Sequence, residues 1–206
     1  KEAQTRFIKD QRDILCKSTD LTDPEFEKSM NLAGRALTEY VLFRQKTIDR
    51  LKKIDKKDRE SEIHNILVPM KRILRSGDFS QDIYINNTWI LDDKFMTYST
   101  ILSDMEMTDL LRELTKDEVI KDDDRPDIAI IFSDDPKTTE KFDVVIVELK
   151  RKGLKPEDNV RVEVQLEKRA RGLYGLYPGK VQSLWLYGVV ELDNDYKSHL
   201  SSAGYH

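Results

Sequence analysis

The sequence has few of the residues that build metal clusters from sulfur or imidazole. It contains one cysteine, Cys16, and three histidines among 206 residues. A single cysteine excludes an internal disulfide framework and a thiolate metal cluster, and it favours a reducing compartment. His64 is far in sequence from the other two histidines, which lie near the end of the chain, so a histidine-based nuclease motif has no second histidine. We expect His64 to be a helix residue in a core or an interface.

Long apolar runs and phosphate-binding loops are also absent from the sequence. No apolar run approaches the length of a membrane span or of a signal-peptide core, so we expect a cytoplasmic location and no membrane partner. Gly179-Lys180 lacks the earlier glycine and the following Ser or Thr of a P-loop. No internal repeat or low-complexity tract is found.

Hydrophobic residues make up 38% of the chain, which is enough for one core and an appended arm. We predict a helical arm and linker over residues 1–57 and one domain over residues 58–206. The sequence Thr22-Asp23-Pro24-Glu25 is typical of a helix start. Apolar residues then recur at spacings of three and four, at Phe26, Met30, Ala33, Leu37, Tyr40, Ile48 and Leu51. Two interpretations stay open: this helix packs on its own domain, or it pairs with a second chain.

The pattern of residues 58–206 predicts a mixed α/β fold. Helical periodicity predicts helices over about 59–74 and 159–173. Apolar stretches predict strands at 88–91, 128–132, 142–147 and 185–190. Because the loop over 133–141 is short and polar, we expect the second and third of these strands to form an antiparallel hairpin.

Charged residues interrupt this hairpin at one end. Asp127 comes at the start of the first strand, and Glu148 and Lys150 follow the apolar run of the second. Side chains alternate along a strand, so Glu148 and Lys150 are predicted to share a face. In an antiparallel hairpin the start of one strand lies beside the end of the other. The two carboxylates are therefore predicted to meet at one edge of the sheet.

Two carboxylates at one edge suit Mg²⁺ or Mn²⁺, because these cations prefer oxygen ligands. The ammonium of Lys150 could orient an attacking water and stabilise the negative charge that develops on a phosphate. With a pKa lowered by the cation, Lys150 could instead accept a proton, and the sequence leaves both roles open. The run Asp122-Asp123-Asp124 could add metal ligands, although an acidic loop is commonly solvated surface.

The pair Pro126-Asp127 and Glu148-Leu149-Lys150, with helices and strands in this order, resembles the PD-(D/E)XK nuclease superfamily, which has a restriction-endonuclease-like fold of helix, three strands, helix and strand. The resemblance implies that Lys150 is catalytic and that Gln165 is a supporting polar group. It also implies metal ligands, which are the carboxylates of Asp127 and Glu148, the backbone carbonyl of Leu149 and, as the helix acid of some relatives, Glu62.

Three further segments resemble one subgroup of this superfamily, and the similarity covers roughly residues 25–190. They are Ala36-Leu37-Thr38-Glu39-Tyr40 with Arg44, the stretch from Glu62 to Met70, and Trp89-Ile90-Leu91-Asp92-Asp93. In that subgroup the nuclease domain follows a GHKL (Hsp90-like) ATPase domain, in bacterial proteins associated with defence against phages and mobile elements. The resemblance implies an upstream ATPase in the same polypeptide as a partner, and control through dimerisation. Because the first residue is Lys1 and no ATPase motif is present, we expect this chain to be the C-terminal piece of a longer protein.

The net charge is −4, yet the region that follows the motif is basic. Residues 150–171 hold eight basic and four acidic side chains. Basic side chains there could bind DNA phosphates, and the candidates are Arg151, Lys152, Arg161, Lys168 and Arg169. The alternative is a solvated helix face of interleaved charges.

The sequence therefore predicts a Mg²⁺-dependent endodeoxyribonuclease that hydrolyses DNA. The alternative is a module that keeps the nuclease fold without turnover and binds nucleic acid or dimerises.

Overall fold

The computed structural model describes residues 22–76, 84–114, 119, 121–132, 141–176 and 179–203. Cys16 and residues 133–140 of the predicted hairpin loop lie outside these ranges. The chain divides into two units, Lys1–Lys53 and Ile54–His206. No helix within the described ranges is long and apolar enough to cross a membrane.

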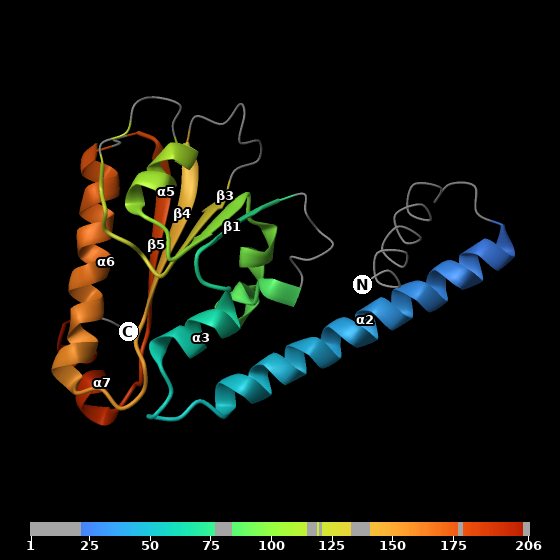
Figure 1. Cartoon of the computed structure of the whole chain (residues 1–206), viewed down its shortest axis with the longest axis horizontal. Coiled ribbons are helices and arrows are strands. Elements are labelled where there is room, and N and C mark those ends of the chain that lie inside the picture. The colour runs from blue at the N-terminus through green and yellow to red at the C-terminus, as the bar shows by residue number, and fades with distance from the viewer. Residues whose placement is uncertain are drawn as a thin grey trace. The chain divides into compact units, whose positions relative to one another are not determined.

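The first unit contains the predicted long helix, α2, over Asp23–Lys52 (Figure 1). Its start is the predicted one: the backbone N–H of Thr22 donates to the Glu25 carboxylate at 3.0 Å, and a proline lies in the first turn. Large apolar side chains along α2 are exposed, at Phe26, Met30, Leu37, Val41 and Leu42. The two interpretations of this helix, packing on its own domain or pairing with a second chain, therefore both stay predictions.

The second unit is an α/β fold around a five-stranded mixed sheet with the order β1-β2-β3-β4-β5. The strands are β1 (Arg72–Arg75), β2 (Thr100–Ser103), β3 (Ile128–Phe132), β4 (Phe142–Leu149) and β5 (Val181–Val189). Each of the first four strands is antiparallel to the next, and β4 and β5 are parallel. A parallel pair needs a crossover connection, which helix α6 (Pro156–Leu176) provides.

Helices cover both faces of the sheet (Figure 1). One face packs against α5 (Met107–Leu114) and α6, and the other against α3 (Glu60–Leu67) and the 3-10 helix η2 (Asp93–Thr97). The residues of β4 alternate between the two cores: Val144 and Ile146 face α5 and α6, whereas Val145 and Val147 face α3. The continuous apolar run is thus a strand buried on both faces, as the sequence predicted.

The helix predicted over 59–74 was wrong in its second half. Helix α3 ends at Leu67, and the chain then turns into β1. Pro69 explains the break, because proline has no N–H to donate and disfavours the helical conformation of the residue before it. Val68 accordingly has φ −147° and ψ 135°, which is extended backbone.

The strand predicted at 88–91 was also wrong. Residues Thr88–Ile90 form the 3-10 helix η1. The side-chain oxygen of Asn86 accepts from both the N–H and the hydroxyl of Thr88, at 3.0 and 2.7 Å. Such local hydrogen bonds to asparagine compete with strand pairing. The first two strands of the sheet, β1 and β2, were not predicted from the sequence. Helices α5 and α7 (Asn194–Ser202) were not predicted either.

Candidate active site

The hairpin of β3 and β4 brings the two predicted carboxylates together. Ile128 pairs with Val147 in the antiparallel register, so Asp127 and Glu148 are the next positions along each strand. An oxygen of the Asp127 carboxylate accepts the backbone N–H of Leu149 at 2.6 Å. Glu148 follows Ile146 on the face that packs against α6. The site therefore lies where β3 begins and β4 ends, on the face of the sheet that packs against α6.

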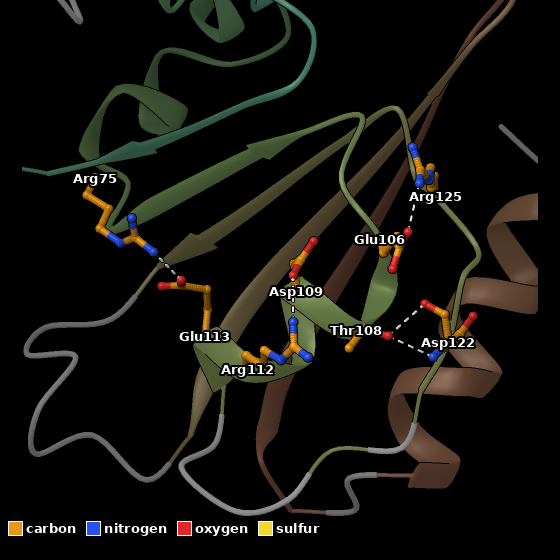
Figure 2. Close-up of polar contacts among 8 residues, drawn as sticks. All are labelled: Arg75, Glu106, Thr108, Asp109, Arg112, Glu113, Asp122 and Arg125. Atoms are coloured by element: carbon orange, nitrogen blue, oxygen red, sulfur yellow. Dashed lines mark hydrogen bonds and ion pairs between the residues drawn. The ribbon is translucent and has the colours of Figure 1, made fainter.

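Helix α5 holds the segment that leads into Asp127 (Figure 2). The hydroxyl of Thr108 donates to the carbonyl of Asp122 at 3.0 Å and accepts that residue's N–H at 2.7 Å. Arg125 pairs with Glu106 at 2.7 Å. These contacts fix residues 122–125 against the start of α5, and the position of Asp127 is set accordingly.

Glu148 is buried, and Asp127 is partly buried. Glu148 is 1% exposed, and burial together with the charge of Asp127 raises its pKa to about 7, against the opposing effects of Arg169 and Lys150. Burial also raises the pKa of Asp127, although the N–H of Leu149 opposes the shift. A cation bound beside these two carboxylates would favour their ionised forms.

His64 reaches the site from α3. It is buried, and its two ring nitrogens lie 3.1 Å from the carbonyl oxygen of Val68 and 2.8 Å from that of Asp127. The prediction of a buried helix residue is confirmed. Its contact with the backbone of Asp127 was missed, because a lone histidine in a sequence has no signal for its partner.

Lys150 lies one residue past the end of β4. Its ammonium donates to the carbonyl of Leu149 at 2.9 Å and lies 3.9 Å from the carboxylate of Glu60. Burial raises the pKa of Glu60, while Lys150 opposes the rise. Glu62, the helix acid that the sequence suggested, is exposed. Both acids lie in the first turn of α3, and only the packing of the helix shows that Glu60 is the one beside Lys150.

Gln165 lies on α6 one turn before Arg169. Its side-chain oxygen is buried and has no hydrogen-bond partner within the part of the chain that the structure describes. Buried amide oxygens are normally paired, so an unpaired one at a candidate site is available to a water or a cation. The supporting role of Gln165 that the resemblance implies stays a prediction.

The predicted phosphate-binding side chains occupy different environments. Arg151 and Lys152 donate to carbonyl oxygens of the loop before α3, at 3.3 and 2.9 Å. Arg161 pairs with Asp158 along α6, and Lys168 pairs with Asp124. These four contacts are at or near the surface.

The prediction that Arg169 binds DNA phosphates at the surface was wrong. It is 7% exposed, and its guanidinium pairs with Glu148 and Asp124. Asp124 is thus an ion-pair partner of Arg169 and Lys168, which hold its pKa below the usual value. Asp123 pairs with Lys121. We therefore do not assign metal binding to the acidic run.

The residues of the site fit a hard divalent cation. Asp127 and Glu148 supply carboxylate oxygens, and the carbonyl of Leu149 and the amide of Gln165 are further oxygen donors. Across the described ranges, no three Asp, Glu, His or Cys side chains are grouped to hold a metal ion by themselves. Mg²⁺ commonly takes only one or two carboxylates and keeps several waters, so two acids suffice for it.

No protein-family model, no curated protein and no solved structure matches this chain.

Proposed function

We propose that residues 58–206 form a nuclease domain of the PD-(D/E)XK type, which hydrolyses DNA phosphodiester bonds with Mg²⁺ or Mn²⁺. The main support is the pairing of a buried carboxylate, Glu148, with a partly buried one, Asp127, and with Lys150 two residues after Glu148 in the chain. Burying two acids together opposes folding, and a purely structural sheet edge has no need of them. Perturbed acids beside a lysine are what metal-assisted cleavage of a phosphodiester requires.

Each residue has a distinct role in this proposal. Asp127 and Glu148 would hold the cation, with the carbonyl of Leu149 and the amide of Gln165 as further donors. The cation, when bound, would act as a Lewis acid towards the scissile phosphate. Lys150 would place a positive charge next to the negative charge that develops on the phosphate oxygens. Glu60, 3.9 Å from Lys150, would keep that ammonium oriented.

Exposed basic residues beside the site support a nucleic-acid substrate. The side chains of Arg161 and Lys168 on α6 are 76% and 65% exposed, and Arg151 lies directly after Lys150. Their present partners are surface acids or carbonyls. Since exposed ion pairs contribute at most about 1 kcal/mol, phosphates can replace them. Binding through such contacts would weaken with salt and would not read sequence.

The order of elements also supports the restriction-endonuclease-like fold: helix α3 precedes the strands, and α6 connects β4 to the parallel strand β5. Helix α5 and an additional strand are extra to the simple order of helix, three strands, helix and strand. A GHKL ATPase domain upstream in the same polypeptide and a role in bacterial defence remain predictions from the resemblance, and a homodimer through the arm remains a prediction from the apolar pattern of α2.

Nicking of supercoiled plasmid tests the proposal. The chain and its Lys150→Ala variant are incubated at low salt with Mg²⁺, Mn²⁺ or EDTA. We expect metal-dependent nicking that Lys150→Ala loses. Lys197→Ala, the same change at an exposed lysine of α7, is the control and should nick normally.

Two results would contradict the proposal. Nicking that persists in EDTA would exclude the metal-dependent reaction. DNA binding without nicking in either metal would favour the inactive binding module instead.

A further inference from the structure

Arg169 is a buried arginine beside Glu148, and each of its three guanidinium nitrogens contacts an oxygen of the protein. Nε lies 3.3 Å from a carboxylate oxygen of Glu148. One terminal nitrogen lies 2.9 Å from the carboxylate of Asp124, and the other donates to the carbonyl of Arg125 at 2.9 Å. The side chain of Arg169 is 8% exposed. It therefore acts inside the protein.

These three contacts join separate parts of the site. Glu148 belongs to β4, whereas Asp124 and Arg125 belong to the segment that runs directly into Asp127. A guanidinium is planar, and its N–H directions are fixed relative to one another. One rigid group on α6 thus sets the carboxylate of Glu148 relative to the backbone two residues before Asp127.

Arg169 also adds the opposite charge where the acids are most crowded. Its guanidinium lies 3.3 Å from the carboxylate of Glu148 and 2.9 Å from that of Asp124. Neutralisation alone, however, would not require contacts to three different acceptors. A buried arginine that uses every nitrogen combines charge compensation with fixed geometry.

Binding of a DNA phosphate by Arg169 is a poor alternative. To reach solvent, the guanidinium would have to leave Glu148 and Asp124. The carboxylate of Glu148, which is 2% exposed, would then be buried without its partner. Breaking one side of a buried ion pair is strongly destabilising. The exposed Lys168, one residue earlier on α6, is available to a phosphate without that loss.

We propose that Arg169 is a positioning residue, which holds Glu148 and the segment before Asp127 in the one arrangement that presents both carboxylates to a single cation. This inference rests on the proposed function, in which Asp127 and Glu148 are metal ligands. It assigns to Arg169 a role in metal affinity, where the sequence had suggested nucleic-acid binding.

The test measures Mn²⁺ binding to the whole chain without DNA, by the decrease of the free Mn²⁺ electron paramagnetic resonance signal. Asp127→Asn should abolish binding. Arg169→Gln should weaken binding by about 10–100-fold, the usual loss when a group that orients a metal ligand is removed. Arg169→Lys should also weaken it, because one ammonium cannot reach three acceptors. Arg171→Gln is the matched control: its side chain is 76% exposed and pairs with Glu167 of the same helix.

Thermal melting by circular dichroism shows which variants are folded at the assay temperature. A folded Arg169→Gln variant that binds Mn²⁺ within about twofold of the unaltered chain, or more tightly, would overturn the positioning role. If Arg169→Gln does not fold, Arg169→Lys is judged by the same criterion, with Arg171→Lys as its control.

The two proposals fail differently. If the unaltered chain binds no Mn²⁺, the metal-dependent function is wrong, and the role of Arg169 is wrong with it. If the chain binds Mn²⁺ through Asp127 and Arg169→Gln leaves that affinity unchanged, only the positioning role is wrong.

Discussion

Replacing Glu148 by glutamine should remove a loss of stability that grows as the pH rises towards 7, while also removing a proposed metal ligand. Burial and the neighbouring Asp127 raise the pKa of Glu148 from 4.5 to about 7. The folded chain therefore keeps this proton to a higher pH than the unfolded chain does. As a result, the free energy of unfolding falls as the pH rises from about 4.5 to about 7, and the penalty is complete above that range.

The size of this penalty follows from the two pKa values. The gap between 4.5 and about 7 corresponds to about 3 kcal/mol, since a tenfold change in proton affinity is about 1.4 kcal/mol. Glutamine has a similar shape and no charge to bury, so Glu148→Gln avoids the penalty. Relative to the unaltered chain, we expect the variant to gain up to about 3 kcal/mol between pH 4 and pH 8.

Urea denaturation in EDTA, followed by tryptophan fluorescence at pH 4 and pH 8, measures this gain. EDTA is needed because a bound cation would favour the ionised acid. Glu167→Gln is the control, since this acid of α6 is exposed and should show no comparable difference between the two pH values. If the stability difference between Glu148→Gln and the unaltered chain does not change with pH, the argument from burial is refuted.

Three further variants are tested by the same denaturation at a single pH. Gly153 has φ +76°, and an added Cβ would lie 3.0 Å from three side-chain atoms of Lys56, whereas Gly179 has φ +87° with nothing within 4 Å. Both alanine variants should lose about 1–2 kcal/mol for the left-handed backbone, and Gly153→Ala should lose more than Gly179→Ala; the reverse order would contradict the contact with Lys56. His64→Ala removes a buried ring whose two nitrogens lie 3.1 and 2.8 Å from the carbonyl oxygens of Val68 and Asp127, and it should cost about 2–4 kcal/mol; a loss below about 1 kcal/mol would show that these contacts contribute little.

Local patterns predicted the hairpin because its signals do not depend on distant parts of the chain. An apolar run buried on both faces, a short polar loop and the two-residue repeat of a strand together define β3, β4 and their register. The helix start at Thr22 was equally readable, since its capping contacts lie within four residues.

Patterns failed where an apolar stretch was compatible with more than one structure. Ile73 and Leu74 continue the helical spacing of α3, yet they belong to β1, because Pro69 breaks the helix and β2 provides a pairing partner. The stretch over 88–91 is apolar enough for a strand, but hydrogen bonds from Thr88 to the side-chain oxygen of Asn86 stabilise a 3-10 turn. In both cases, contacts outside the apolar stretch decided the conformation.

The sequence by itself predicted that Asp127 and Glu148 lie close together, because the start of one strand of an antiparallel hairpin lies beside the end of the other, and the observed register agrees. It also predicted that Lys150 lies near Glu148, because the two residues are only two positions apart in the chain. Only the tertiary structure decided which helix residues face the site. Glu60 lies beside Lys150 while Glu62 is exposed, and Arg169 is buried against Glu148 while Lys168 remains at the surface. Packing against the sheet sets the rotation of a helix about its axis. The order of charged residues in the sequence does not show which of them will face the site.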